Sequence, residues 1–287
     1  MSQRPRRSVL YMPAANARAM EKAKGLDCDG IILDLEDAVA PDAKPAARQA
    51  ACDAVRGGGY GHREVVVRVN AMGTQWHDED MAAVCQAGPD AIAVPKVSSA
   101  GQVHELVARM DEHGAGASTS LWAMLETPRA IIDADAICGA SERLEVVVMG
   151  TNDLLAELRA RPAQDRGPLS LALSAALCAA RANQKVILDG VFNDIHDAEG
   201  FERECVAGRD LGFDGKTLIH PRQVGIANQL WAPTSGDVEE ARELIATFDA
   251  AIARGEGVVT FHGKMIENLH VETARRTLAL HEAIIGR

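Results

Sequence analysis

The chain has 287 residues, of which 47% are hydrophobic and 25% are charged, and its formal net charge is −11. This length suits one large α/β barrel or two ordinary domains, in either case with a substantial core. The acidic balance and the lack of a basic stripe argue against a nucleic-acid partner, and no apolar run approaches membrane-spanning length.

Eight short apolar runs have the length and the Val and Ile content of buried strands. They cover residues 8–12, 30–35, 64–69, 91–94, 121–125, 145–149, 186–188 and 217–219. Stretches that read as helices lie between them, at residues 16–24, 44–56, 100–113 and 197–211, and residues 161–168 read as a polar surface insertion. This alternation predicts a TIM (β/α)8 barrel, an α/β fold. A doubly wound open sheet is the alternative, although no GxGxxG follows the first predicted strand.

The remainder of the chain is expected to extend the barrel. Thr234 and Asp237 have capping-box spacing, which predicts a helix through about Ala253. Residues 255–263 are expected to form a flexible connection, and residues 264–285 a final helix. The predicted domains are therefore a barrel over residues 1–232 and a C-terminal helical extension over residues 233–287, which would act as a lid or an oligomer contact.

Active-site groups of such barrels lie at the carboxyl ends of the strands. The predicted strand ends carry polar residues among which acids dominate: Asp34, Glu36, Asp37, Arg68, Asn70, Lys96, Glu126, Asp153, Asp189 and His220. Strand ends are often polar because they meet water, so no single member is diagnostic. Arg68 is more informative, since an arginine between Val67 and Val69 on a buried strand needs a compensating charge.

Glu126 and Asp153 follow consecutive predicted strands and could converge on one hard cation. Each of them alone would more often be a cap or a surface group, and Thr127-Pro128 already explains a helix start after Glu126. Two carboxylates suit Mg2+, which keeps several waters and takes substrate oxygens as ligands. Zinc is not favoured, because His220 would be the only imidazole at a strand end, and His220-Pro221 reads as a structural turn.

The six cysteines lie far apart, without a CxxC motif or zinc-like spacing to histidine. This pattern is typical of reduced core thiols in a cytoplasmic protein. The basic residues 1–7 precede too few apolar residues for a secretory signal.

Nine segments together make the chain resemble the citrate lyase β-chain and malyl-CoA lyase family (HpcH/HpaI aldolase-like) over nearly its whole length. They are residues 7–13, 35–41, 68–70, 95–97, 126–128, 150–154, 189–194, 215–221 and 263–266. The resemblance implies a TIM barrel that binds Mg2+ and acts on CoA or carrier-protein thioesters of hydroxy-dicarboxylic acids. It also implies a homo-oligomer, a trimer or hexamer, in which the C-terminal segment caps the site of a neighbour.

The resemblance also assigns roles to residues of this chain. Glu126 and Asp153 become the Mg2+ ligands, so that Glu126 also contributes to substrate binding through the metal. Arg68 becomes the residue that grips the substrate and stabilises an enolate. Glu36 and Asp37 fall in the acidic loop of the family, close to the site, and become candidate catalytic acids.

Two further assignments concern Lys44 and Glu267. Lys44 is a candidate contact for a CoA phosphate. Glu267 stands where many family lyases have an aspartate that acts as acid or base across a subunit interface, and the proline that usually follows is absent. The longer side chain matters, because a displacement of about 1 Å can cost roughly 100-fold in rate.

The implied function is a Mg2+-dependent carbon–carbon lyase that cleaves malyl-, citramalyl- or citryl-CoA by retro-aldol chemistry, giving a CoA thioester and a small 2-oxo acid. A thioesterase acting on the same substrates is the first alternative, because a metal and an arginine could equally assist attack by water. A non-catalytic ligand-binding subunit is the second. The acid half of the substrate and its stereochemistry do not follow from the sequence.

Overall fold

A computed structural model describes residues 4–255 and 258–287 of the chain. These residues divide into two compact units. The larger unit is Arg6–Asn228, and the smaller one combines residues 4–5 with Gln229–Arg287.

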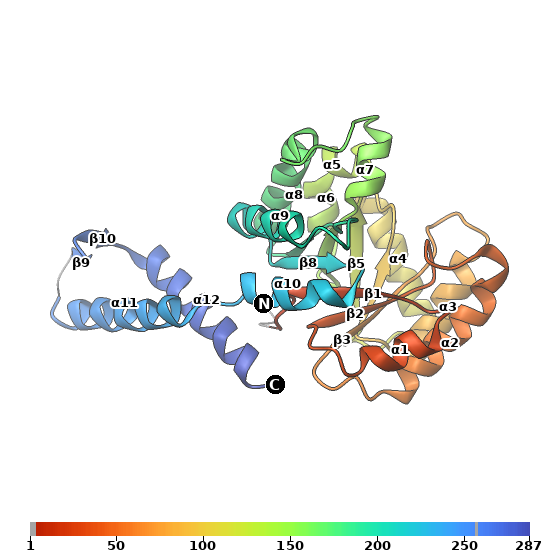
Figure 1. Cartoon of the computed structure of the whole chain (residues 1–287), viewed down its shortest axis with the longest axis horizontal. Helices are drawn as coiled ribbons and strands as arrows, with labels where there is room; N and C mark the ends of the chain where they lie inside the picture. Colours follow the sequence, from red (N-terminus) through yellow and green to blue (C-terminus); the bar gives the residue numbers. More distant parts are fainter. Residues whose placement is uncertain (1–3, 256–257) are drawn as a thin grey trace. The chain divides into compact units, whose positions relative to one another are not determined.

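The larger unit is a closed barrel of eight parallel strands in sequence order, as the fold prediction required (Figure 1). The strands are β1 (Ser8–Pro13), β2 (Gly30–Asp34), β3 (Glu64–Arg68), β4 (Ala91–Val94), β5 (Ser120–Leu125), β6 (Leu144–Met149), β7 (Val186–Asp189) and β8 (Gly215–Leu218). The open-sheet alternative is therefore wrong, because β1 pairs with β8 and closes the sheet.

Helices follow the strands around the outside of the barrel (Figure 1). They are α1 (Ala17–Ala23), α2 (Lys44–Gly57), α3 (His77–Ala87), α4 (Ala100–Glu112), α5 (Pro128–Ile132), α6 (Ala134–Gly139), α7 (Thr151–Glu157), α8 (Ser170–Ala182), α9 (Ala198–Leu211) and α10 (Val224–Leu230). Short 3-10 helices occupy Pro41–Ala43, Gly167–Leu169 and Pro221–Gln223. The boundary between the two units falls inside α10.

Small and branched side chains fill the barrel interior. The buried cluster inside it contains Val9, Ile32, Val66, Ala91, Ala93, Trp122, Met124, Val146, Val148 and Leu188. Strands buried on both faces favour such residues, which explains why the aromatic content of the chain can be only 3%. The packed interior leaves the strand ends as the place for a site.

Ion pairs close the amino-terminal end of the barrel. The Arg6 guanidinium lies 2.6 Å from a carboxylate oxygen of Glu64, and Arg7 lies 2.9 Å from Asp29. Gly215 allows β8 to approach this end, because a Cβ there would lie 1.9 Å from the Arg6 carbonyl oxygen. These contacts stabilise the end of the barrel opposite to the predicted site.

The loop at residues 161–168 is exposed, as the predicted polar surface insertion requires, with the exception of Arg166. Arg166 of this loop is buried, and its Nη1 donates to Asp189 at the end of β7 over 2.9 Å. Lys216 of β8 binds the same carboxylate over 2.8 Å, and these two cations hold the pKa of Asp189 below its usual range even though burial acts to raise it. The loop is tied to the barrel because a buried acid needs such partners.

The smaller unit contains α11 (Ser235–Ala253), a hairpin of β9 (Val259–Phe261) and β10 (Lys264–Ile266), and α12 (Asn268–Ile285). The capping box is confirmed, since the Asp237 N–H donates to the Thr234 hydroxyl and the Thr234 N–H donates to the Asp237 carboxylate.

Two predictions for this unit are wrong. Residues 255–263 contain strand β9 rather than only a flexible connection, apart from residues 256–257, which lie outside the described residues. The last helix begins at Asn268, because residues 264–266 form β10. His262 and Gly263 both have positive φ, of 50° and 76°, as a two-residue hairpin turn requires. Val259, Phe261 and Ile266 then pack with Ala251 of α11.

In the described part of the chain, no helix combines the length and the apolar character needed to cross a membrane.

Candidate active site

The carboxyl ends of the barrel strands enclose a cavity of about 300 Å³. Its walls bring together most of the predicted site residues, although these are far apart in the sequence. The lining includes Tyr11, Asp34, Asp37, Arg68, Met124, Glu126, Gly150, Thr151, Asn152, Asp153, Val191, Asn193 and Thr217. The expectation that the polar strand ends form one site is met for β2, β3, β5 and β6.

The charge that compensates Arg68 is that of Asp34, a residue that was predicted only to lie at a strand end. The two residues lie opposite each other on β3 and β2, and both are buried. The Arg68 Nε and Nη2 atoms donate to the two oxygens of Asp34, each over 2.7 Å. This bidentate pair fixes the plane of the guanidinium.

Asp34 also fixes the acidic loop that follows β2. Its oxygens accept the backbone N–H groups of Glu36 and Ala38 over 2.9 and 3.0 Å. The remaining Arg68 nitrogen, Nη1, lies 2.9 Å from Glu36 and 3.5 Å from Asp37. One buried carboxylate therefore positions both the arginine and the loop that carries two predicted catalytic acids.

Burial raises the pKa of Glu36 to about 7. The positive charge of Arg68 opposes this rise, whereas Asp37 and Asp34 add to it. A carboxyl group with such a pKa is divided between its two protonation states at neutral pH, which suits a general acid or base. The side chain of Asp37 is exposed.

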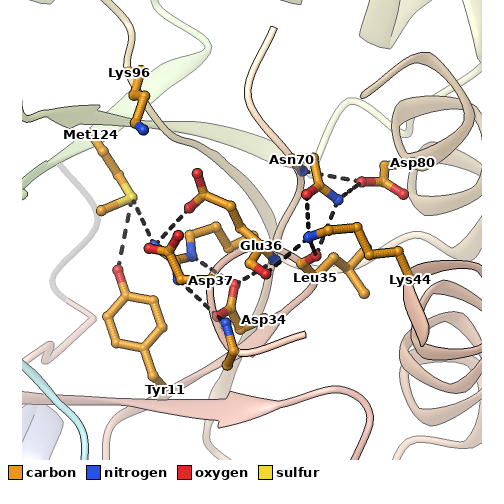
Figure 2. Close-up of polar contacts among 12 residues, drawn as sticks. Tyr11, Asp34, Leu35, Glu36, Asp37, Lys44, Asn70, Asp80, Lys96 and Met124 are labelled. Carbon is orange, nitrogen blue, oxygen red and sulfur yellow. Dashed lines mark hydrogen bonds and ion pairs between the residues drawn. The ribbon is translucent and has the colours of Figure 1, made fainter. Parts of the chain in front are cut away.

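Tyr11 of β1 lies beneath the arginine, a position that the sequence analysis did not single out. Its ring centroid is 4.8 Å from the Arg68 guanidinium carbon, and its hydroxyl lies 3.8 Å from the Met124 sulfur (Figure 2). Burial raises the pKa of the Tyr11 phenol, so the hydroxyl stays protonated. An aromatic residue at an inward position of a barrel strand was the available signal.

Glu126 enters the cavity directly after β5, and its side chain is 2% exposed. One of its oxygens accepts the backbone N–H of Lys96 over 2.7 Å. Gly150 leaves room for the carboxylate, because a Cβ at that position would lie 2.2 Å from the other oxygen. Thr127 caps α5 as expected, with its hydroxyl accepting the Ala130 N–H over 3.0 Å.

Asp153 reaches the same cavity from the first turn of α7. Its carboxylate lies 3.5 Å from the Lys96 ammonium. Burial, together with the charges of Asp153 and Glu36, raises the pKa of Glu126 to about 8. Glu126 thus lies in a site where negative charge exceeds the fixed positive charge near it.

That excess fits a divalent cation held by Glu126 and Asp153. Within residues 4–255 and 258–287, no cluster of three or more His, Cys, Asp or Glu side chains is arranged to hold a metal ion. A site with two carboxylates leaves most positions of an octahedral ion to water and substrate, which is the usual arrangement for Mg2+. The residues present therefore fit Mg2+ better than zinc.

Lys44 lies away from the cavity surface, on the far side of the acidic loop. It is 5% exposed. Its ammonium donates to the Leu35 and Glu36 carbonyl oxygens, each over 2.9 Å, and to Asn70 Oδ1 over 2.6 Å (Figure 2). All three ammonium protons have acceptors, so a phosphate contact would require Lys44 to give up these bonds. The structure favours a positioning role.

The remaining candidates have structural partners. His220 begins a 3-10 helix, and its Nδ1 accepts the Arg222 N–H over 3.2 Å, as the predicted turn implies. Glu267 belongs to the smaller unit, where it precedes α12 and its N–H donates to His270 Nδ1 over 3.0 Å. Its role as an acid or base stays a prediction.

Comparisons with known proteins identify the family of the chain. The sequence model of the HpcH/HpaI aldolase/citrate lyase family matches residues 7–221. A (3S)-malyl-CoA thioesterase of Cereibacter sphaeroides (strain KD131) is 47% identical over 280 residues, which cover 98% of this chain and 96% of that protein. The citrate lyase subunit beta of Escherichia coli (strain K12) is 35% identical over 285 residues, or 97% of this chain and 94% of that protein.

Solved structures give the same result. CitE from Mycobacterium tuberculosis, in complex with magnesium, acetoacetate and coenzyme A, has a TM-score of 0.77 and 31% identity, covering 96% of this chain and 97% of that one. The citrate lyase beta subunit from M. tuberculosis, complexed with oxaloacetate and magnesium, has a TM-score of 0.69 and 32% identity, covering 81% and 100%. The chain described here belongs to the HpcH/HpaI aldolase/citrate lyase family of enzymes.

Proposed function

We propose that this chain is a Mg2+-dependent enzyme that hydrolyses the CoA thioester of a hydroxy-dicarboxylic acid of the malyl type. The observation that supports it is the convergence of Glu126, Asp153 and Arg68 on one cavity. The sequence alone placed carbon–carbon cleavage first. The identity of 47% to a malyl-CoA thioesterase, against 35% to a citrate lyase subunit, favours hydrolysis.

Glu126 and Asp153 would hold the metal ion, for which they would supply oxygen ligands from the position directly after β5 and from the first turn of α7. When bound, Mg2+ supplies positive charge that polarises substrate oxygens and orients the hydroxy acid. Gly150 keeps the space in which the Glu126 carboxylate turns toward the cavity.

Arg68 would hold the thioester oxygen or a substrate carboxylate through Nη1, because Nε and Nη2 are committed to Asp34. Glu36, with a pKa raised to about 7 by burial, is placed against this nitrogen and would act as the general base. It takes a proton from water as the water oxygen attacks the thioester carbon. The C–S bond then breaks, and the leaving thiolate of CoA takes up a proton.

Carbon–carbon cleavage is the second candidate, favoured by the similarity to citrate lyase subunits. In that reaction a base removes the substrate hydroxyl proton, and the bond to the acyl-CoA half breaks to give an enolate. Arg68 would stabilise the enolate oxygen, a contribution often of about 3–4 kcal/mol. Glu267 of a neighbouring copy would protonate the enolate carbon, which requires the proposed trimer or hexamer.

Product analysis separates these candidates. The purified protein is incubated with malyl-, methylmalyl-, citramalyl- and citryl-CoA, with Mg2+ or with a chelator. Free hydroxy acid plus CoA indicates a thioesterase, and 2-oxo acid plus acyl-CoA indicates a lyase. Binding of Mg2+ and oxaloacetate by calorimetry, without turnover of any thioester, would indicate a ligand-binding subunit instead. Light scattering on the same sample tests the trimer or hexamer.

A further inference from the structure

Lys96 has an unusual backbone conformation at the edge of the cavity. It follows β4, and its φ of 58° lies in the left-handed region, which is unfavourable for a residue with a side chain. This conformation directs its N–H to Glu126, over 2.7 Å. Strained residues of this kind persist where the surrounding structure holds them, often at functional sites.

The side chain of the same residue reaches the second predicted metal ligand. The Lys96 ammonium lies 3.5 Å from Asp153, and the charges of Asp153, Glu36 and Glu126 together raise its pKa although burial opposes this. One residue therefore contacts Glu126 through its backbone and Asp153 through its ammonium. Its positive charge lies where a divalent cation would be held.

The ammonium of Lys96 is free to move, in contrast to that of Lys44. The Lys96 side chain is 47% exposed and Asp153 is 40% exposed, whereas Lys44 is buried and bonded to three acceptors. A half-exposed ion pair is weak and exchanges readily with other partners. Lys96 can leave Asp153 without a change in the backbone that positions Glu126.

We propose that Lys96 is a displaceable counter-ion: its ammonium pairs with Asp153 while no divalent cation is bound, and moves to the anionic group of the substrate once the cation takes its place. This inference rests on the proposed metal-dependent function. The movement of the Lys96 ammonium makes the binding of the cation and the binding of the anionic substrate mutually favourable. Each ligand offsets the charge that the other brings into the cavity. Such coupling is reciprocal by linkage.

The test is calorimetric titration with Mg2+, with and without oxaloacetate, on the wild type and on Lys96→Met. Without oxaloacetate, the variant should bind Mg2+ about three- to tenfold more tightly, because no ammonium competes. Oxaloacetate should tighten Mg2+ binding to the wild type by more than it does for the variant. Lys22→Met, at an exposed position of α1, removes the same charge and should match the wild type.

Two more variants separate the effect of the Lys96 side chain from that of its backbone conformation. Lys96→Gly should show the same tighter Mg2+ binding and a higher melting temperature, since glycine adopts positive φ without cost. Lys96→Arg should retain the wild-type coupling. Unchanged or weaker Mg2+ binding by both Lys96→Met and Lys96→Gly would overturn the counter-ion role while leaving the metal site in place. Absence of Mg2+ binding by the wild type would instead overturn the proposed function together with it.

Discussion

The two acidic sides of the cavity differ in how their charge is balanced. On the β2–β3 side, Asp34 receives two hydrogen bonds from the buried Arg68, and Glu36 forms an ion pair with the same guanidinium. On the β5–β6 side, Glu126 receives one backbone N–H, and Asp153 only a looser contact of 3.5 Å with Lys96. The ion pairs on the β2–β3 side hold the guanidinium of Arg68 in place. The β5–β6 side has carboxylates whose charge an added cation can neutralise.

The largest expected effect is on the less balanced side. Glu126→Ala should reduce turnover by at least about 1000-fold, since it removes a ligand of the proposed metal. The thermal melting temperature without metal should not fall, because burial disfavours the charged form of this carboxyl group and raises its pKa. Turnover assays and calorimetry with Mg2+ measure this. Glu157→Ala, at an exposed position of α7, is the control, and unchanged turnover of Glu126→Ala would remove this residue from the site.

On the balanced side, Asp34→Asn should lower both stability and activity. Breaking a buried ion pair costs about 3–5 kcal/mol, and the loss here should be near the lower limit because Glu36 still contacts Arg68. Activity should fall by about 100-fold as the guanidinium and the loop shift. Urea unfolding and steady-state kinetics measure the two effects. A variant with wild-type stability would show that the Asp34–Arg68 pair does not support the fold.

Arg68→Lys should reduce kcat/KM by at least about tenfold. Lysine keeps the charge but cannot form the bidentate pair with Asp34 while also presenting a third donor to the cavity. The comparison with Asp34→Asn in a double-mutant cycle shows whether the two residues act as one unit. Activity close to that of the wild type would contradict a contact between Arg68 and the reacting thioester.

The excess negative charge should also appear in the pH dependence of stability. Burial raises the pKa values of Glu36 and Glu126 to about 7 and about 8. The folded protein thus retains protons that the unfolded chain has lost above about pH 4.5, so stability falls as pH rises toward 8. In a chelator, the melting temperature should be a few degrees lower at pH 8.5 than at pH 5.5. Glu126→Gln should reduce this difference, and an equal difference in that variant would exclude Glu126 as its source.

The smallest expected effect is that of Tyr11→Phe. The variant keeps the ring beneath Arg68 and loses only a hydroxyl whose contact is the Met124 sulfur at 3.8 Å. Turnover should change by less than about twofold. Tyr11→Leu, which removes the aromatic face, should reduce kcat/KM more. Equal effects of both variants would assign the role of Tyr11 to its hydroxyl rather than to its ring.

Much of the fold followed from the sequence, because the signals for it are local. Short apolar runs marked all eight strands, and Thr127 and Thr234 marked the starts of two helices. The hairpin of β9 and β10 was missed, although residues 259–261 alternate between apolar and polar side chains just before His262-Gly263. A turn with two positive φ angles is harder to recognise when its first residue is histidine rather than asparagine or aspartate.

The sequence by itself determined the barrel and the polar character of its strand ends, since both depend on spacing along the chain. Only the tertiary structure decided the partners: Asp34 for Arg68, three oxygens for Lys44, and Arg166 for Asp189. These pairs join residues from 8 to 34 positions apart. Charge balance depends on distances in space and on burial, which set the pKa of Glu126 and are not encoded in any local pattern.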